Sequence, residues 1–162
     1  MREVAIWMVL SGVILTSHAQ EVQTKSSIAR TDLATCIKDA SVFHKVNDTI
    51  LEAILRIESH LKPETIHKND NDTIDIGIAG LNSVHLAELS QFGIGQTDLL
   101  NPCIGTYVGA WHLAKKYRKY GNTWQAVGAY HSETPAENQR YQNLIYQEVQ
   151  KILRRTNVSQ AQ

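Results

Sequence analysis

The chain has 162 residues, with 16 Lys or Arg against 16 Asp or Glu, so its formal charge is zero. Hydrophobic residues make up 43% and charged residues 20%, which excludes a disordered, collagen-like or multi-spanning membrane protein. The charge balance also argues against nucleic acid as a partner, because phosphate binding needs a net basic surface. The length suits one domain, and we expect a monomer.

The first 19 residues have the layout of a secretory signal peptide. Arg2 supplies a cation, residues 4–16 are apolar or small, and Ser17 and Ala19 are the small residues of a cleavage site. The apolar run is shorter than the about 20 residues that a membrane-spanning helix needs. We therefore favour a cleaved signal peptide over the alternative, an uncleaved anchor, and expect the mature chain to be exported.

Capping residues and apolar spacing predict helices between two polar segments, residues 20–30 and 156–162, which we expect to be flexible. The helices are expected from residue 31 or 32 to about 40, over 49–60, 84–92, 103–120 and 124–130, and in a terminal segment marked by apolar positions from 141 to 152. Residues 67–75 are polar, and their Asn-Asp runs predict a turn or small hairpin. The sequence thus predicts one mainly helical domain over residues 31–155, with an irregular or β-hairpin segment after the second helix.

Cys36 and Cys103 are the two cysteines of the sequence. In an oxidising compartment such a pair predicts one disulfide, which would stabilise the fold by about 4 kcal/mol. Two buried free thiols are the alternative. Neither cysteine has the neighbours of a nucleophile, so we interpret both as structural.

Glu58 continues the apolar face of the second expected helix. The residues that share this face at helical spacing are Leu51, Ile54, Leu55 and Glu58. Burial raises the pKa of a carboxyl group and lets it act as a general acid near neutral pH. On geometry alone, the commoner alternative is an exposed Glu at the helix end that pairs with Arg56 or Lys62.

A second carboxylate, Asp75, follows in the polar segment, directly before the Ile76-Gly77 turn. One carboxylic acid in an apolar setting and one carboxylate in a polar setting is the division of roles that glycoside cleavage uses. The pair predicts a glycosidase-type site.

The residues around this pair resemble the lysozyme-like superfamily, and within it the small exported lytic transglycosylases of secretion, conjugation and type IV pilus systems. The resemblance covers about residues 33–152. It is carried by Glu58-Ser59, Thr73-Ile74-Asp75-Ile76-Gly77-Ile78-Ala79-Gly80-Leu81-Asn82-Ser83, Asn101-Pro102-Cys103, Gly109-Ala110 and the run from Tyr120-Gly121 to Ala129-Tyr130. Cys36 and Cys103 also match the positions of that group's disulfide.

The resemblance implies an α+β, lysozyme-like fold and a periplasmic enzyme that acts on peptidoglycan glycan strands. It implies cleavage of the β-1,4 bond between N-acetylmuramic acid and N-acetylglucosamine, with 1,6-anhydro ends as the product. The purpose would be local opening of the cell wall for a secretion, conjugation or pilus apparatus, whose components are candidate partners.

Carried over by residue, Glu58 is the catalytic acid and base. Ser59 would orient the substrate or Glu58, while Asn82, Ser83 and Tyr130 would line the substrate groove. Asp75 matches the second carboxylate of c-type lysozymes, which most lytic transglycosylases lack.

Two positions depart from the family pattern. Gly80 stands where the family has Gln, which removes a polar side chain from the groove, and His131 stands where the family has Asn. With Asp75 present, a hydrolytic muramidase is one alternative. A weakly active peptidoglycan-binding assembly protein is the other.

We expect no cofactor and no metal. The seven His residues show no His-Glu-x-x-His spacing, and the cysteines show no Cys-x-x-Cys spacing.

Overall fold

The computed structural model describes residues 32–160, so the expected signal peptide and the segment of residues 20–30 lie outside the described residues. The chain divides into two compact units, Met1–Ala34 and Thr35–Gln162, and the account below concerns the second. A helix that ends at residue 44 comes first. The later helices are α2 (Asp48–Ser59), α3 (Leu86–Leu89), α4 (Pro102–Tyr120), α5 (Trp124–His131) and α6 (Pro135–Gln160), with 3-10 turns η1 (Ser83–His85), η2 (Ser90–Phe92) and η3 (Asp98–Leu100).

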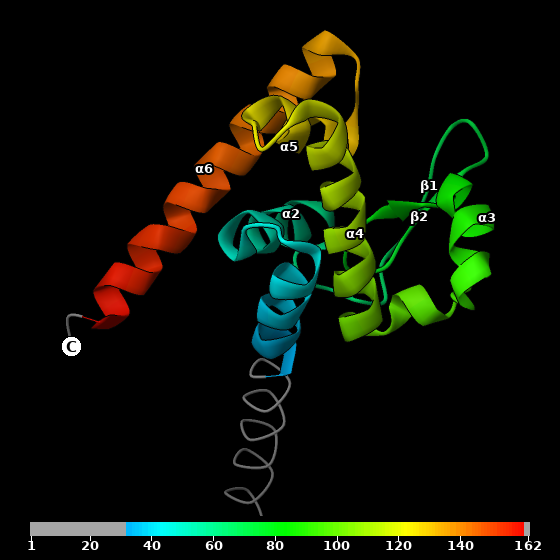
Figure 1. Ribbon diagram of the computed structural model, residues 1–162, viewed down its shortest axis with the longest axis horizontal. Helices are drawn as coiled ribbons and strands as arrows, with labels where there is room; N and C mark the ends of the chain where they lie inside the picture. The colour runs from blue at the N-terminus through cyan, green and yellow to red at the C-terminus, as the bar shows by residue number, and fades with distance from the viewer. Residues whose placement is uncertain (1–31, 161–162) are drawn as a thin grey trace, which may run out of the picture. The chain divides into compact units, whose positions relative to one another are not determined.

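A small antiparallel sheet follows α2. Its three strands, β1 (Ile66–Lys68), β2 (Ile74–Ile76) and β3 (Leu81–Asn82), are in the order β1-β2-β3. The register places Asp75 between His67 on β1 and Asn82 on β3. Figure 1 shows the sheet and α3 on one side of α4 and α6 on the other. The predicted fold class, mainly α with a small β segment after the second helix, is confirmed.

Local capping explains where the main helices begin. The Asn47 side chain accepts a hydrogen bond from the Ile50 N–H at 2.9 Å, and Asn101 caps α4 ahead of Pro102. The Thr123 side chain caps α5 in the same way. The last helix differs from expectation, because α6 begins at Pro135 and continues to Gln160, past residue 155.

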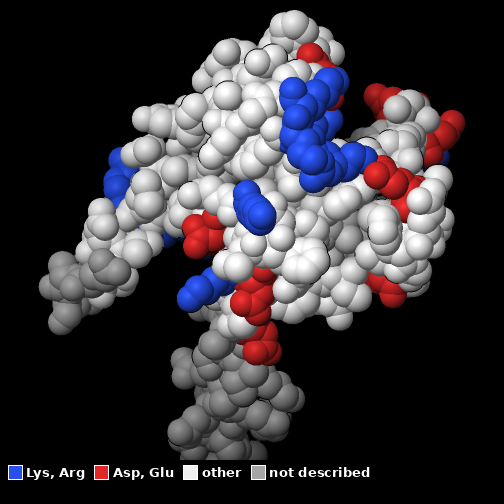
Figure 2. All heavy atoms as spheres, viewed as in Figure 1, with Lys and Arg blue, Asp and Glu red and all other residues white. Residues whose placement is uncertain are grey.

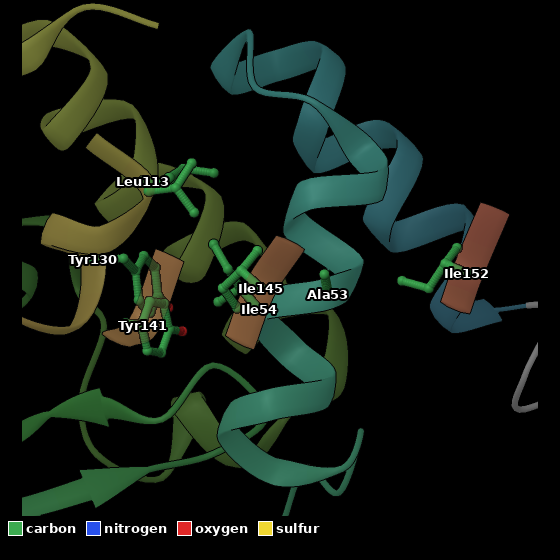
Figure 3. Close-up of a cluster of buried hydrophobic side chains, with 8 residues drawn as sticks. Ala53, Ile54, Leu113, Tyr130, Tyr141, Ile145 and Ile152 are labelled. Carbon is green, nitrogen blue, oxygen red and sulfur yellow. The ribbon is translucent and has the colours of Figure 1, made fainter. Parts of the chain in front are cut away.

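The main core lies where α2, α4, α5 and α6 meet (Figure 3). Its buried members are Ala53, Ile54, Leu113, Val127, Tyr130, Tyr141, Ile145 and Ile152. A second cluster of Ile76, Leu81, Leu89, Leu99 and Val108 joins the sheet to α4. The core therefore holds the end of α2 and the sheet in fixed positions. Within residues 32–160, no helix has the length and apolar character to cross a membrane.

Cys36 and Cys103 form a disulfide with a Cα–Cα distance of 5.3 Å, which joins the first helix to the start of α4. This confirms the disulfide over the alternative of free thiols. Such a cross-link is typical of exported proteins.

Candidate active site

Glu58 lies in the last turn of α2, which ends where His60 takes a left-handed conformation with φ of 56°. The carboxyl group is largely shielded from water, and this burial raises its pKa from 4.5 to about 7. The nearby charge of Asp75 acts in the same direction, while a hydrogen bond from Tyr141 opposes both. Arg56 forms its ion pair with Glu52 at 2.7 Å. The carboxyl group is therefore shielded on the apolar face of α2, and Arg56 pairs with Glu52 rather than with Glu58.

Tyr141 of α6 holds the Glu58 carboxyl group in place. Its hydroxyl donates a hydrogen bond to Oε1 of Glu58. Its ring stacks against that of His131, at 5.0 Å between ring centroids, and against that of Tyr130, at 6.4 Å. Figure 3 shows the Tyr130 and Tyr141 side chains next to each other. Burial and the neighbouring carboxyl group keep the pKa of Tyr141 well above its ordinary value, so the hydroxyl remains a donor.

Asp75 lies on β2 and faces the same cleft as Glu58. Its Oδ1 accepts a hydrogen bond from Nδ2 of Asn82 at 2.8 Å. The same nitrogen donates to Oγ1 of Thr73 at 2.9 Å, and Oδ1 of Asn82 accepts from the Val84 N–H. Asn82 therefore orients Asp75 through a network that also fixes the start of η1.

Gly80 packs directly against Glu58. Its backbone has φ of +55°, and a Cβ atom there would lie 2.6 Å from Oε2 and 3.0 Å from Cβ of Glu58. Gly80 lines the cleft and, as the sequence interpretation states, contributes no polar side chain to it. A side chain at this position would first displace Glu58.

A cleft of about 560 Å³ contains these groups. Its walls are the β1–β2 hairpin, the turn before β3, and the junction of α5 with α6. Figure 2 shows a hollow between the lysine-rich end of α4 and the lobe that carries the sheet. The candidate site residues that line it are Glu58, Asp75, Gly80, Asn82, Tyr130 and His131. Two carboxyl groups in one groove, one of them with a pKa near 7, are suited to general acid catalysis on a polymer.

Comparison with known protein families matches residues 35–150 to the family described as the transglycosylase SLT domain. The chain belongs to this family. The SLT domain is that of lytic transglycosylases, and it implies peptidoglycan as the substrate.

Several bacterial proteins are similar to the chain in sequence. The chain is 34% identical to the invasion protein IagB of Salmonella typhimurium over 124 residues, which cover 74% of the chain and 78% of the relative. It is 31% identical over 125 residues to a peptidoglycan-binding-like protein of Escherichia coli O157:H7, with 72% and 73% covered. It is 34% identical over 109 residues to the X polypeptide of Escherichia coli K12, with 65% and 64% covered.

Ser59, expected to orient the substrate or Glu58, and Ser83, expected in the groove, are outside the cleft lining in the structure. Ser59 is buried, and its hydroxyl donates to the Ile78 carbonyl at 2.8 Å. Ser83 accepts a hydrogen bond from the Ile74 N–H at 3.1 Å. Both side chains therefore bond backbone groups of the segment that carries Asp75 and Gly80.

Tyr130 contributes to both the cleft wall and the scaffold. Its buried hydroxyl donates to the Ala79 carbonyl at 2.8 Å, which fastens the turn of residues 77–80 to α5. His112 holds α5 in turn through Nε2, 3.2 Å from the Tyr130 carbonyl. Burial is the main reason that the pKa of His112 is lowered to about 3, so the ring is neutral and donates here.

Sequence reasoning missed Tyr141 as a site residue and treated it as an apolar position of the last helix. A buried tyrosine hydroxyl needs a partner, and that requirement is the signal that could have indicated a polar neighbour. The reasoning also missed Lys116, which lines the cleft and pairs with Glu133 at 3.0 Å. Within residues 32–160, no three His, Cys, Asp or Glu side chains gather as a metal-ligand group.

Proposed function

We propose that this SLT domain cleaves the β-1,4 bond between N-acetylmuramic acid and N-acetylglucosamine and leaves 1,6-anhydro ends. The observation that carries the proposal is the state of Glu58. Its pKa of about 7 leaves a large fraction protonated at neutral pH, and the group lies in a cleft of about 560 Å³ beside a second carboxylate. A carboxylic acid in that state donates a proton without an added cofactor.

In the first step, the protonated Glu58 gives its proton to the glycosidic oxygen. The bond between that oxygen and C1 of the muramic acid breaks, and the N-acetylglucosamine part leaves with a free hydroxyl group. Positive charge develops on the muramic acid ring, and the carboxylate of Asp75 stabilises it. Asn82 holds Asp75 for this role through its 2.8 Å hydrogen bond.

In the second step, Glu58 is a carboxylate and accepts a proton. The 6-hydroxyl of the same muramic acid attacks C1, its proton passes to Glu58, and the 1,6-anhydro ring closes. The Tyr141 hydroxyl stabilises the carboxylate form between the steps. Glu58 ends protonated, so the cycle consumes no water.

The test is mass spectrometry of soluble products after the purified protein is incubated with peptidoglycan sacculi. We expect anhydro-muramic ends from the native protein and none from Glu58→Gln. Glu64→Gln is the matched control, because Glu64 is exposed in the segment between α2 and β1. Reducing ends would contradict the transglycosylase chemistry and indicate hydrolysis, and bound protein without products would indicate a wall-binding role.

We also propose that the protein works in the periplasm and opens the wall locally for a secretion, conjugation or pilus apparatus. The disulfide supports export. The sequence motifs that resemble the transglycosylases of secretion, conjugation and pilus systems support the link to such an apparatus, and one similar protein, from Salmonella, is named an invasion protein. Expression of the full chain in a bacterium, followed by fractionation and mass measurement, tests the location. We expect a periplasmic form that lacks residues 1–19, and a full-length cytoplasmic form would contradict this.

A further inference from the structure

A second, smaller hollow of about 180 Å³ adjoins the active-site cleft and shares Glu58 and His131 with it. Its other lining residues are Ile57, Arg140, Tyr141 and Leu144. The hollow therefore lies between the end of α2 and the first turns of α6, next to the proposed site of bond cleavage. We refer to it below as the arm pocket.

The size of the arm pocket suits a substituent of the substrate. Pockets that enclose a whole small-molecule ligand usually measure about 300–1,000 Å³, which is larger than this hollow. Because the arm pocket and the cleft share Glu58 and His131, a group that fills the arm pocket would lie close to the bond that Glu58 is proposed to protonate. A side arm of the sugar next to that bond meets both conditions.

The lining of the arm pocket combines two aliphatic side chains and one cation with the polar side chains of Glu58, Tyr141 and His131. Ile57 and Leu144 supply aliphatic surface, and Leu144 is 43% exposed although it is apolar. Arg140 is the one lysine or arginine in the lining. The arrangement fits a ligand that carries small methyl groups and a carboxylate.

Arg140 is free to change its partner. It pairs with Glu137 at 2.7 Å, and the two side chains are 69% and 45% exposed. An ion pair as exposed as this contributes little to stability, so a ligand carboxylate can replace Glu137 at low cost. The planar guanidinium group binds a carboxylate through two parallel hydrogen bonds, which a lysine cannot reproduce.

We propose that the arm pocket binds the lactyl arm of the muramic acid beside the cleaved bond, and that Arg140 binds a carboxylate of the attached peptide stem. This inference rests on the proposed function. The methyl groups of the lactyl and alanyl units would contact Ile57 and Leu144. The pocket would thus make the enzyme select strands with charged stems over strands with neutral ones.

The experiment compares two substrates made from one preparation of soluble, uncross-linked glycan strands with intact peptide stems. One half is left untreated, and in the other half the stem carboxylates are converted to amides. Binding is measured in a Glu58→Gln background, where no cleavage occurs, and cleavage is measured with native Glu58. The same two strands are tested with Arg140→Ala, Arg140→Lys and Arg154→Ala.

We expect amidation to weaken binding and lower kcat/KM about three- to tenfold for the native sequence, the range of a partly exposed charge-assisted hydrogen bond. On untreated strands, Arg140→Ala should show the same three- to tenfold reduction in binding and in kcat/KM. On amidated strands, it should show no further reduction. Arg140→Lys should retain part of the preference. Arg154→Ala removes the same charge from an exposed position of α6 outside the cleft and arm pocket, and should behave as the native sequence.

A full preference for untreated strands in Arg140→Ala would overturn the assignment of Arg140. An equal loss in Arg154→Ala would show a general charge effect and would also overturn it. Failure of the proposed function is a separate result, because then the native protein would cleave neither strand while the binding comparison would still decide the role of Arg140.

Discussion

The hydroxyl of Tyr141, near the start of α6, donates a hydrogen bond to Oε1 of Glu58, in the last turn of α2. Packing of α2 against α6 brings the two residues together. Burial raises the pKa of Glu58, and this hydrogen bond lowers it. The value of about 7 is therefore a balance, which substitution can shift in either direction.

Tyr141→Phe should raise the pKa of Glu58. Without the donor the carboxylate form is less stable, so the pKa of Glu58 rises and the alkaline limb of the pH–rate profile moves to higher pH. The profile of product release from sacculi measures this. Tyr146→Phe, at an exposed position of the same helix, is the control. An unchanged limb in Tyr141→Phe would show that the hydrogen bond does not set the pKa.

Asp75→Asn should have the opposite effect on the pH profile. The Asp75 charge raises the pKa of Glu58, so its removal moves the alkaline limb to lower pH. We also expect kcat to fall about 100-fold, because the positive charge in the transition state loses its counter-charge. Asp72→Asn is the control, since Asp72 lies in the same hairpin and is not part of the cleft lining. A rate near that of Asp72→Asn would limit Asp75 to a structural role in the sheet.

Glu58 should also make stability depend on pH. Its pKa is about 7 in the folded chain and 4.5 when exposed, so as pH rises through this window the unfolded chain releases the proton first. The free energy of unfolding therefore decreases from pH 4.5 to 7, by at most about 3 kcal/mol from this group. Urea unfolding of the native protein and Glu58→Gln at pH 4.5 and 8 measures the difference. Parallel pH dependence in the two proteins would contradict the buried carboxyl.

Gly80→Ala should damage the site and the fold together. The added Cβ would lie 2.6 Å from Oε2 of Glu58, and the left-handed backbone disfavours any side chain. Gly93→Ala is a matched control, because Gly93 has φ of +71° and no atom within 4 Å of a Cβ there. We expect both to lose about 1 kcal/mol of stability from backbone strain. Gly80→Ala alone should also lose at least tenfold in activity, and equal activity in the two variants would refute the contact with Glu58.

Most of the helices could be predicted from the sequence because their signals are local. Asn47, Pro102 and Thr123 mark helix starts through contacts within one turn, and the structure confirms each. The hairpin was predicted as a possibility from its polar residues. The third strand was not, because Leu81–Asn82 is too short to show a periodic pattern.

The site was only partly accessible to sequence reasoning. The buried face of α2 predicts the raised pKa of Glu58, since helical spacing is fixed within the helix. The hydroxyl of Tyr141 meets Glu58 only through tertiary packing, and apolar spacing cannot reveal that contact. The close contact of Gly80 with Glu58 could not be predicted for the same reason, because it depends on tertiary packing and on the left-handed backbone of Gly80.

The turn of residues 77–80 should tolerate inserted residues less well than the tip between β1 and β2. Ser59 fastens this turn at the Ile78 carbonyl and Tyr130 fastens it at the Ala79 carbonyl, while Gly80 lies against Glu58. One inserted residue there would break the spacing of these attachments and move the acid. An insertion at the exposed tip between β1 and β2 would only lengthen a cleft wall. The length of the hairpin, and with it the extent of the cleft wall that contacts substrate, can therefore vary, while the length of the turn stays fixed.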